Sequence, residues 1–136
     1  LNPKKGRDFE EKVCQALQKK YKQNFSKKAI CIGNPPKKHE FDLVSSDGKY
    51  IIECKCYLWT KGKNIPSAKI AILNEAVFYL SHISKNKYRF LIMKKDFSEK
   101  RQETLAQYYF RINRHLLGGV KILEFNESSH KLRAIK

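Results

Sequence analysis

Two apolar segments on either side of a turn sequence constrain the fold of this chain more than any other feature. Residues 39–44 and 49–58 are rich in strand-forming side chains, and Ser45-Ser46-Asp47-Gly48 separates them. An Asp-Gly pair between two such segments favours a tight turn, because glycine readily adopts the positive φ that hairpin turns require. The sequence therefore predicts a β-hairpin near the middle of the chain.

Helices and further strands are predicted on both sides of this hairpin. Apolar side chains recur at helical spacing over residues 8–21, with Asn2-Pro3 as the start of that helix. The same spacing predicts a second helix over residues 65–83 and a third that begins at Ser98. Strands are expected at residues 29–32, 88–93 and 120–125, the last one pairing with residues 132–135. This alternation predicts an α/β fold with a central mixed β-sheet flanked by helices.

The length and the charge narrow the class of protein. The chain has 136 residues, which suits a single domain over residues 1–136. It contains 29 Lys and Arg against 13 Asp and Glu, a formal net charge of +16 at pH 7. Hydrophobic residues make up 41%, which excludes a disordered basic tail, so this charge lies on a folded surface. Such a surface is typical of proteins that bind polyanions: we expect DNA first, and RNA remains open.

The sequence also bears on the cellular compartment. No apolar segment approaches the roughly 20 residues that cross a bilayer, so no membrane partner is expected. The four cysteines lack the spacing of a zinc-binding loop; they are Cys14, Cys31, Cys54 and Cys56. We expect reduced thiols and a cytoplasmic location.

Acidic and basic residues lie close together on the predicted hairpin. Alternate residues of a strand share a face, so Glu53 and Lys55 project together, whereas Cys54 projects towards the core. Antiparallel pairing can bring Asp42 close to Glu53. Two neighbouring carboxylates repel each other, and their hard oxygen atoms suit Mg²⁺. The alternative is an ordinary ion pair between Lys55 and one of these acids.

This pattern resembles the signature of the PD-(D/E)xK, or restriction-endonuclease-like, nuclease superfamily. The matching residues are Phe41-Asp42 and Glu53-Cys54-Lys55, and Gly6 to Glu10 resembles the leading helix of that family. The resemblance covers residues 6–93, and Phe41 stands where the family name has proline. It implies a restriction-endonuclease-like core and a Mg²⁺-dependent endonuclease that hydrolyses phosphodiester bonds in DNA, with Mn²⁺ as a substitute metal. It also implies metal ligation by Asp42, Glu53 and the backbone carbonyl of Cys54.

The roles of these residues follow from the chemistry. A metal held by the two carboxylates relieves charge on the phosphoryl oxygens and helps to activate water. Lys55 is expected to orient that water or to stabilise the developing negative charge. Helix geometry places Glu10 at the edge of the buried stripe and Glu11 in solvent, so Glu10 is the fourth candidate catalytic residue. The alternative is that both are ordinary acids on the helix surface.

Residues that flank this motif are candidates for contacts with DNA. Lysines there can neutralise phosphates, and the single tryptophan, Trp59, can stack on a base or simply pack in the core. The candidate DNA-binding residues are Lys37, Lys38, Lys61, Lys63, Lys69 and Trp59.

Two other functions remain open from the sequence. One is a catalytically inactive nucleic-acid-binding module of the same fold. The other is a basic protein-interaction subunit that contacts an acidic partner. A nuclease that cuts both strands generally needs two active sites, so a homodimer would suit the leading hypothesis.

Overall fold

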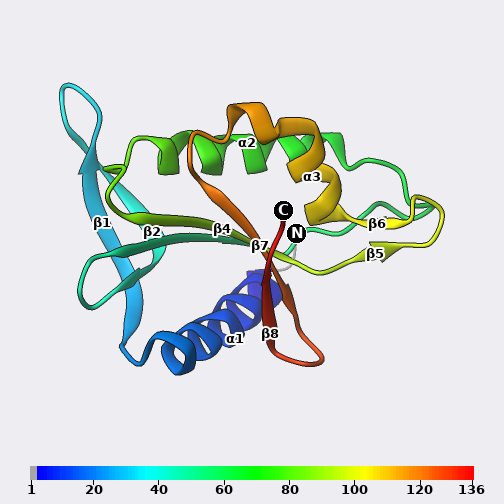
Figure 1. Cartoon of the computed structure of the whole chain (residues 1–136), viewed down its shortest axis with the longest axis horizontal. Coiled ribbons are helices and arrows are strands. Elements are labelled where there is room, and N and C mark those ends of the chain that lie inside the picture. Colours follow the sequence, from blue (N-terminus) through cyan, green and yellow to red (C-terminus); the bar gives the residue numbers. More distant parts are fainter. Residues whose placement is uncertain (1–2) are drawn as a thin grey trace.

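A six-stranded mixed sheet forms the centre of the computed structural model, which describes residues 3–136 (Figure 1). The strand order is β1-β2-β3-β4-β7-β8. The strands are β1 (Phe25–Ile32), β2 (Lys37–Ser45), β3 (Tyr50–Lys55), β4 (Tyr88–Lys94), β7 (Lys121–Asn126) and β8 (Lys131–Ala134). β4 runs parallel to both of its neighbours, β3 and β7, and the remaining pairs are antiparallel. The predicted α/β class, the central hairpin and the final strand pair are confirmed.

Helices cover both faces of this sheet. α1 (Pro3–Tyr21) lies on one face, and α2 (Ser67–Ser81) and α3 (Leu105–Asn113) lie on the other, with a single 3₁₀ turn, η1 (Arg114–Leu116), after α3 (Figure 1). On the α1 side, Phe9, Val13 and Leu17 are buried against the sheet. The ring of Phe9 meets that of Phe125 edge to face, with 5.9 Å between the ring centres. Amphipathic periodicity thus placed the buried side of α1 correctly.

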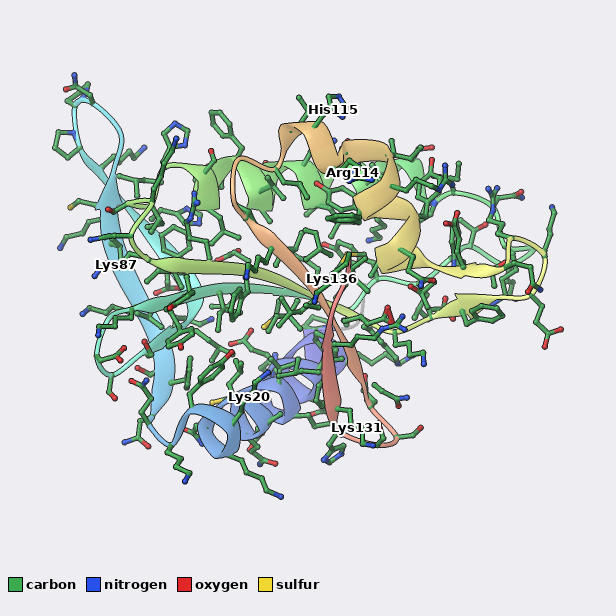
Figure 2. All side chains as sticks on the ribbon, in the orientation of Figure 1. Lys20, Lys87, Arg114, His115, Lys131 and Lys136 are labelled. Carbon is green, nitrogen blue, oxygen red and sulfur yellow. The ribbon has the colours of Figure 1, made fainter. Side chains whose placement is uncertain are left out.

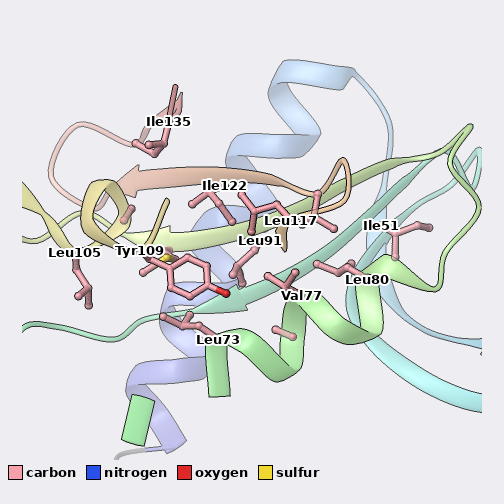
Figure 3. Packing of buried hydrophobic residues seen from close by; sticks show 14 of the residues in the cluster. Ile51, Leu73, Val77, Leu80, Leu91, Leu105, Tyr109, Leu117, Ile122 and Ile135 are labelled. Carbon is pink, nitrogen blue, oxygen red and sulfur yellow. The ribbon is translucent and has the colours of Figure 1, made fainter. Parts of the chain in front are cut away.

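The second apolar cluster lies between the sheet and the α2–α3 layer (Figure 3). Leu73, Val77 and Leu80 of α2 pack there with Leu91 of β4. The hydroxyl of Tyr109 in α3 donates a 2.8 Å hydrogen bond to Asn74 of α2, which joins the two helices. The sheet is therefore buried on both faces at its centre, as parallel strands require.

The third helix begins later than the sequence pattern indicated. Ser98 lies instead in a short strand, β5 (Phe97–Ser98), which pairs with β6 (Glu103–Thr104). Gln102 has a φ of 56°, which closes the turn between these strands and prevents a helix from starting at Ser98. The helix starts after Thr104, whose side chain accepts from the backbone N–H of Gln107 while the Gln107 side chain accepts from the backbone N–H of Thr104.

The remaining differences are small. α1 begins at Pro3, as the Asn2-Pro3 start predicted, although the apolar pattern itself covers only residues 8–21; Asn2, the expected cap, lies outside the described residues. All four cysteines are free thiols. Within residues 3–136, no helix combines the length and the apolar character needed to cross a membrane.

Candidate active site

A β-bulge positions Asp42. Ser26 of β1 pairs with Val44 of β2, but Lys28 pairs with Phe41, so Lys27 faces two residues of β2. As a result, Phe41 packs in the cluster on the α2 side, whereas Leu43 packs in the cluster on the α1 side. In a regular strand these two residues would share a face. Asp42 thus lies at the point where β2 exchanges the faces of its side chains.

Asp42 and Glu53 lie directly across from each other, as the hairpin register predicted. The regular pairing of β2 and β3 ends at Leu43 and Ile52, and Asp42 and Glu53 are the next residues along. The backbone N–H of Asp42 donates a 3.2 Å hydrogen bond to Oε1 of Glu53. The backbone N–H of Cys54 donates a 2.8 Å hydrogen bond to Oδ2 of Asp42. Each carboxylate is therefore fixed by a backbone group of the opposite strand.

The electrostatics of this pair favour a cation. The side chain of Glu53 is 7% exposed. Burial, and then the nearby charge of Asp42, raise the pKa of Glu53 to about 8. The hydrogen bonds found for these two carboxylates within residues 3–136 use Oε1 of Glu53 and Oδ2 of Asp42, so Oδ1 of Asp42 and Oε2 of Glu53 stay free to bind a cation. A divalent cation between them would favour the ionised form of both groups.

Glu10 belongs to the same electrostatic cluster. It is half-buried, and burial followed by the charge of Asp42 raises its pKa, while Lys27 and Lys55 act in the opposite direction. Glu11, the next residue, is exposed. The structure thus brings Glu10 towards Asp42, Glu53 and Lys55, and leaves Glu11 in solvent.

Lys55 and Cys54 complete the group at the end of β3. Lys55 is half-buried, and none of the ion pairs found in residues 3–136 uses its ammonium group. The thiol of Cys54 packs on the α1 side, and burial raises its pKa well above the usual value. A neutral thiol is a poor metal ligand, so only the backbone of Cys54 is suited to face the acids.

The donor set determines which metal the site suits. Within the described part of the chain, no group of three or more His, Cys, Asp or Glu side chains is arranged to hold a metal ion. The residues present offer two carboxylates with free oxygens, together with a backbone carbonyl at Cys54. Such a sparse oxygen set fits Mg²⁺, which keeps several waters and is often held by one or two carboxylates plus substrate phosphates.

The predicted DNA-binding lysines divide into two groups. Lys37 and Lys38 are exposed at the start of β2, five and four residues from Asp42 along the strand. The others follow β3: Lys61 is exposed, and the ammonium of Lys63 lies 3.9 Å from Asp96.

Lys69, at the start of α2, contacts the ring of Tyr57, which follows β3. Its ammonium lies 4.9 Å from the ring centre of Tyr57. The pKa of Tyr57 is raised by burial, and the charges of Lys55 and Asp42 also act on it. Tyr57 and Lys27 were missed as neighbours of the site, because the bulge that brings Lys27 opposite Asp42 leaves no mark in the sequence.

Of the two roles left open for Trp59, packing in the core is the one that the structure shows, and the stacking role is wrong. Its side chain is 5% exposed and packs edge to face with Tyr108, 5.5 Å between ring centres. Its backbone N–H donates to Oδ2 of Asp96 at 2.9 Å, and its indole N–H donates to the backbone carbonyl of Asp96 at 3.0 Å. The guanidinium of Arg101 covers the ring at 5.1 Å. Trp59 is therefore a core residue with no open face for a base.

The positive charge is spread widely over the molecule. Figure 2 shows labelled basic side chains that project from α1, the loop before β4, η1 and the start of β8, for example Lys20, Lys87, Arg114 and Lys131. The molecule as a whole therefore presents a basic surface that attracts anions.

Comparisons with known proteins add little to this description. No family model matches the chain, and no curated protein matches it. One solved structure that is similar is the SfsA protein of Pyrococcus furiosus in complex with Ca²⁺, with 16% identity and a TM-score of 0.45. The match covers 95% of this chain and 60% of that chain. A likeness at this level assigns neither a family nor an activity.

Proposed function

We propose that this chain is a metal-dependent endonuclease of the PD-(D/E)xK type that hydrolyses phosphodiester bonds in DNA. The observation that carries the proposal is the pair of hydrogen bonds that hold Asp42 and Glu53 side by side, with Lys55 two residues after Glu53 on the same face of β3. A buried carboxylate next to another carboxylate is costly unless a cation or proton compensates it. A net charge of +16 around two acids is consistent with a phosphate substrate and a bound cation between them.

Each residue has a defined task in this proposal. Asp42 and Glu53 would hold Mg²⁺ through Oδ1 and Oε2, and Glu10 would bind a metal-bound water. The metal, when bound, supplies charge relief to the phosphoryl oxygens and lowers the pKa of water. Lys55 carries the positive charge that stabilises the extra negative charge of the transition state and orients the attacking water. Lys69 and Lys61 would contact phosphates on either side of the scissile bond.

The test is a cleavage panel with purified protein. Linear, supercoiled, single-stranded and branched DNA, and RNA, are incubated with Mg²⁺, Mn²⁺ or EDTA. We expect cleavage of at least one DNA substrate with either metal and none with EDTA. Asp42→Asn and Lys55→Ala should each lower the rate by about 100-fold or more, since groups that act on transition-state charge contribute on this scale.

The control is a substitution of a lysine that lies away from the site. Lys85→Ala removes an exposed lysine of the loop before β4 and should cut like the unaltered protein. If Asp42→Asn and Lys55→Ala also cut at the unaltered rate, the site is assigned wrongly.

A second candidate function is supported by the metal-ligand geometry itself. Since no group of three ligating side chains is present in residues 3–136, the same basic surface could bind nucleic acid without cleaving it. In that case the protein would bind DNA in a strongly salt-dependent manner, and Asp42→Asn would bind at least as tightly. No metal would produce cleavage of any substrate in the panel.

A further inference from the structure

A buried glutamate lies outside the candidate active site. Glu124 of β7 is 1% exposed, and its Oε1 accepts two hydrogen bonds. The hydroxyl of Thr104 donates at 3.0 Å, and Nη2 of Arg133 donates at 2.9 Å. Its other oxygen, Oε2, is buried and has no partner among the described residues. A buried carboxylate oxygen without a donor is costly, so Oε2 of Glu124 is an acceptor that a donor group of a ligand would satisfy.

The surroundings of Glu124 form a cavity with cationic walls. The cavity has a volume of about 340 Å³. Its lining residues are Lys95, Glu124, Asn126, Ser129, Lys131, Leu132 and Arg133. Lys95, Lys131 and Arg133 are exposed, and Figure 2 shows Lys131 on the β8 hairpin. A carboxylate below three cations is suited to a ligand that combines a hydrogen-bond donor with an anion.

The cavity lies near the candidate active site on the same face of the sheet. Lys55 of β3 pairs with Met93 of β4, and Met93 pairs with Glu124 of β7. Two strand spacings therefore separate Lys55 from Glu124, about 10 Å between their Cα atoms. Leu123 and Phe125 pack on the α1 side, so Glu124 faces the α3 side, as Met93 does. A DNA strand at the active site would pass within reach of this cavity.

We propose that this cavity is a subsite for one nucleotide of the DNA substrate, with a base that carries an exocyclic amino group. The amino group donates to Oε2 of Glu124, and Lys95, Lys131 and Arg133 bind the adjacent phosphates. Cytosine is the base that best separates this idea from others, because a carboxylate accepts from its N4 amino group, whereas thymine has a carbonyl oxygen at that position. The inference rests on the proposed function for the identity of the ligand, and it adds a base preference.

The experiment measures binding in EDTA, so that cleavage plays no part. Fluorescently labelled single strands of eight deoxycytidines or eight thymidines are titrated with the protein, and anisotropy gives the dissociation constants. We expect the cytosine strand to bind about 10-fold more tightly, the difference that one hydrogen bond to a charged group can produce. Equal affinity for the two strands overturns the subsite.

Glu124→Gln is the variant that tests the contact with the base most directly. The amide oxygen can still accept from Thr104 and Arg133, while the amide NH₂ replaces the free Oε2 with a donor. That donor matches the thymine carbonyl, so the preference should disappear or reverse. A variant that folds and retains the full preference for cytosine also overturns the proposal.

A substitution at an exposed residue tests the proposal if Glu124→Gln does not fold. Lys131→Ala should weaken the binding of both strands by a similar factor and should lower the slope of log K against log salt concentration by about 0.7. Lys85→Ala is the matched control and should leave both values unchanged. If Lys131→Ala binds both strands with the same affinity and salt dependence as this control, the proposed phosphate contact is wrong.

The outcomes also separate this subsite from the proposed nuclease activity. A base preference without cleavage in the metal panel would leave the subsite and remove the nuclease. Cleavage without a base preference would support the nuclease activity and overturn the subsite.

Discussion

The backbone N–H of Asp42 donates its hydrogen bond to the side chain of Glu53, while the side chain of Asp42 accepts from the backbone of Cys54, the residue next to Glu53. The two acids are thus fixed by main-chain groups across a hairpin. Fixing two like charges in this way costs folding free energy, and binding of a cation or a proton offsets that cost. The stability of the protein should therefore respond to pH and to metal through this pair.

The first prediction concerns pH. The pKa of Glu53 is raised from an ordinary carboxyl value near 4.5 to about 8, so in the folded protein this group keeps a proton that the unfolded chain has already released. Between these two values the folded state binds more protons, and the free energy of unfolding falls as pH rises, by up to about 1.4 kcal/mol per pH unit. Without divalent metal, the protein should therefore be more stable at pH 5 than at pH 8.

Glu53→Gln should flatten this dependence, because glutamine does not titrate. The measurement is urea unfolding at several pH values in EDTA for both proteins. Added Mg²⁺ should raise the stability of the unaltered protein more at pH 8 than at pH 5, since metal and proton compete for the same oxygens. A variant with the same pH slope as the unaltered protein would show that Glu53 is not the group responsible.

A second prediction compares two neighbouring acids of α1. Glu10 is half-buried and lies in the electrostatic range of Asp42, whereas Glu11 is exposed. Glu10→Gln should raise the Mg²⁺ concentration needed for half-maximal cleavage by about 10-fold or more, because groups that support a metal site have effects on this scale. Glu11→Gln makes the same chemical change one position along and should leave the metal dependence as it was. Equal effects of the two changes would assign Glu10 to the ordinary helix surface.

The third prediction separates packing from recognition at Trp59. Trp59→Phe keeps most of the buried ring but leaves the carbonyl of Asp96 without its indole donor. We expect the unfolding free energy to fall by about 1–3 kcal/mol. Urea unfolding monitored by circular dichroism measures this change. DNA affinity should stay within about twofold of the unaltered value under conditions in which both proteins are folded. A large loss of DNA affinity from a folded Trp59→Phe protein would restore a direct contact with the substrate.

A fourth prediction concerns the two glycines after η1. A Cβ atom at Gly119 would lie 2.5 Å from Nη2 of Arg89, whereas a Cβ at Gly118 would meet nothing within 4 Å. Both residues have a positive φ, so both alanine variants bear backbone strain. Gly119→Ala should be less stable than Gly118→Ala by about 1–3 kcal/mol, because it also displaces the buried guanidinium that donates to the carbonyl of Gly118. Thermal unfolding of the two proteins gives the comparison directly.

The sequence predicted those parts of the fold that depend on local patterns. The Asp47-Gly48 turn specified the hairpin, and the hairpin register was enough to bring Asp42 towards Glu53. Helical periodicity likewise distinguished the half-buried Glu10 from the exposed Glu11. These features depend on spacing along the chain, which a single sequence displays in full.

Features that depend on distant partners were left open or missed. Trp59 is buried because Asp96, 37 residues later, supplies acceptors for both of its N–H groups. Ser98 fails as a helix start because it pairs within the β5–β6 hairpin and Thr104 offers the better cap. The role proposed for Glu124 could not be predicted from the sequence either, because it depends on an unpartnered oxygen in a cavity that forms only on folding.

The β-bulge of β2 opposite Lys27 has a consequence for how β2 can evolve. Because β2 holds one residue more than β1 at that point, the face on which Asp42 lies depends on the number of residues as well as on their identity. Deletion of one residue from β2 beside Asp42 would restore regular pairing with β1 and exchange the faces of the side chains beyond it. Every acidic residue would still be present in such a sequence, yet the carboxylates would no longer meet. Changes of length in this hairpin should therefore be tolerated far less well than changes of residue type on its exposed side.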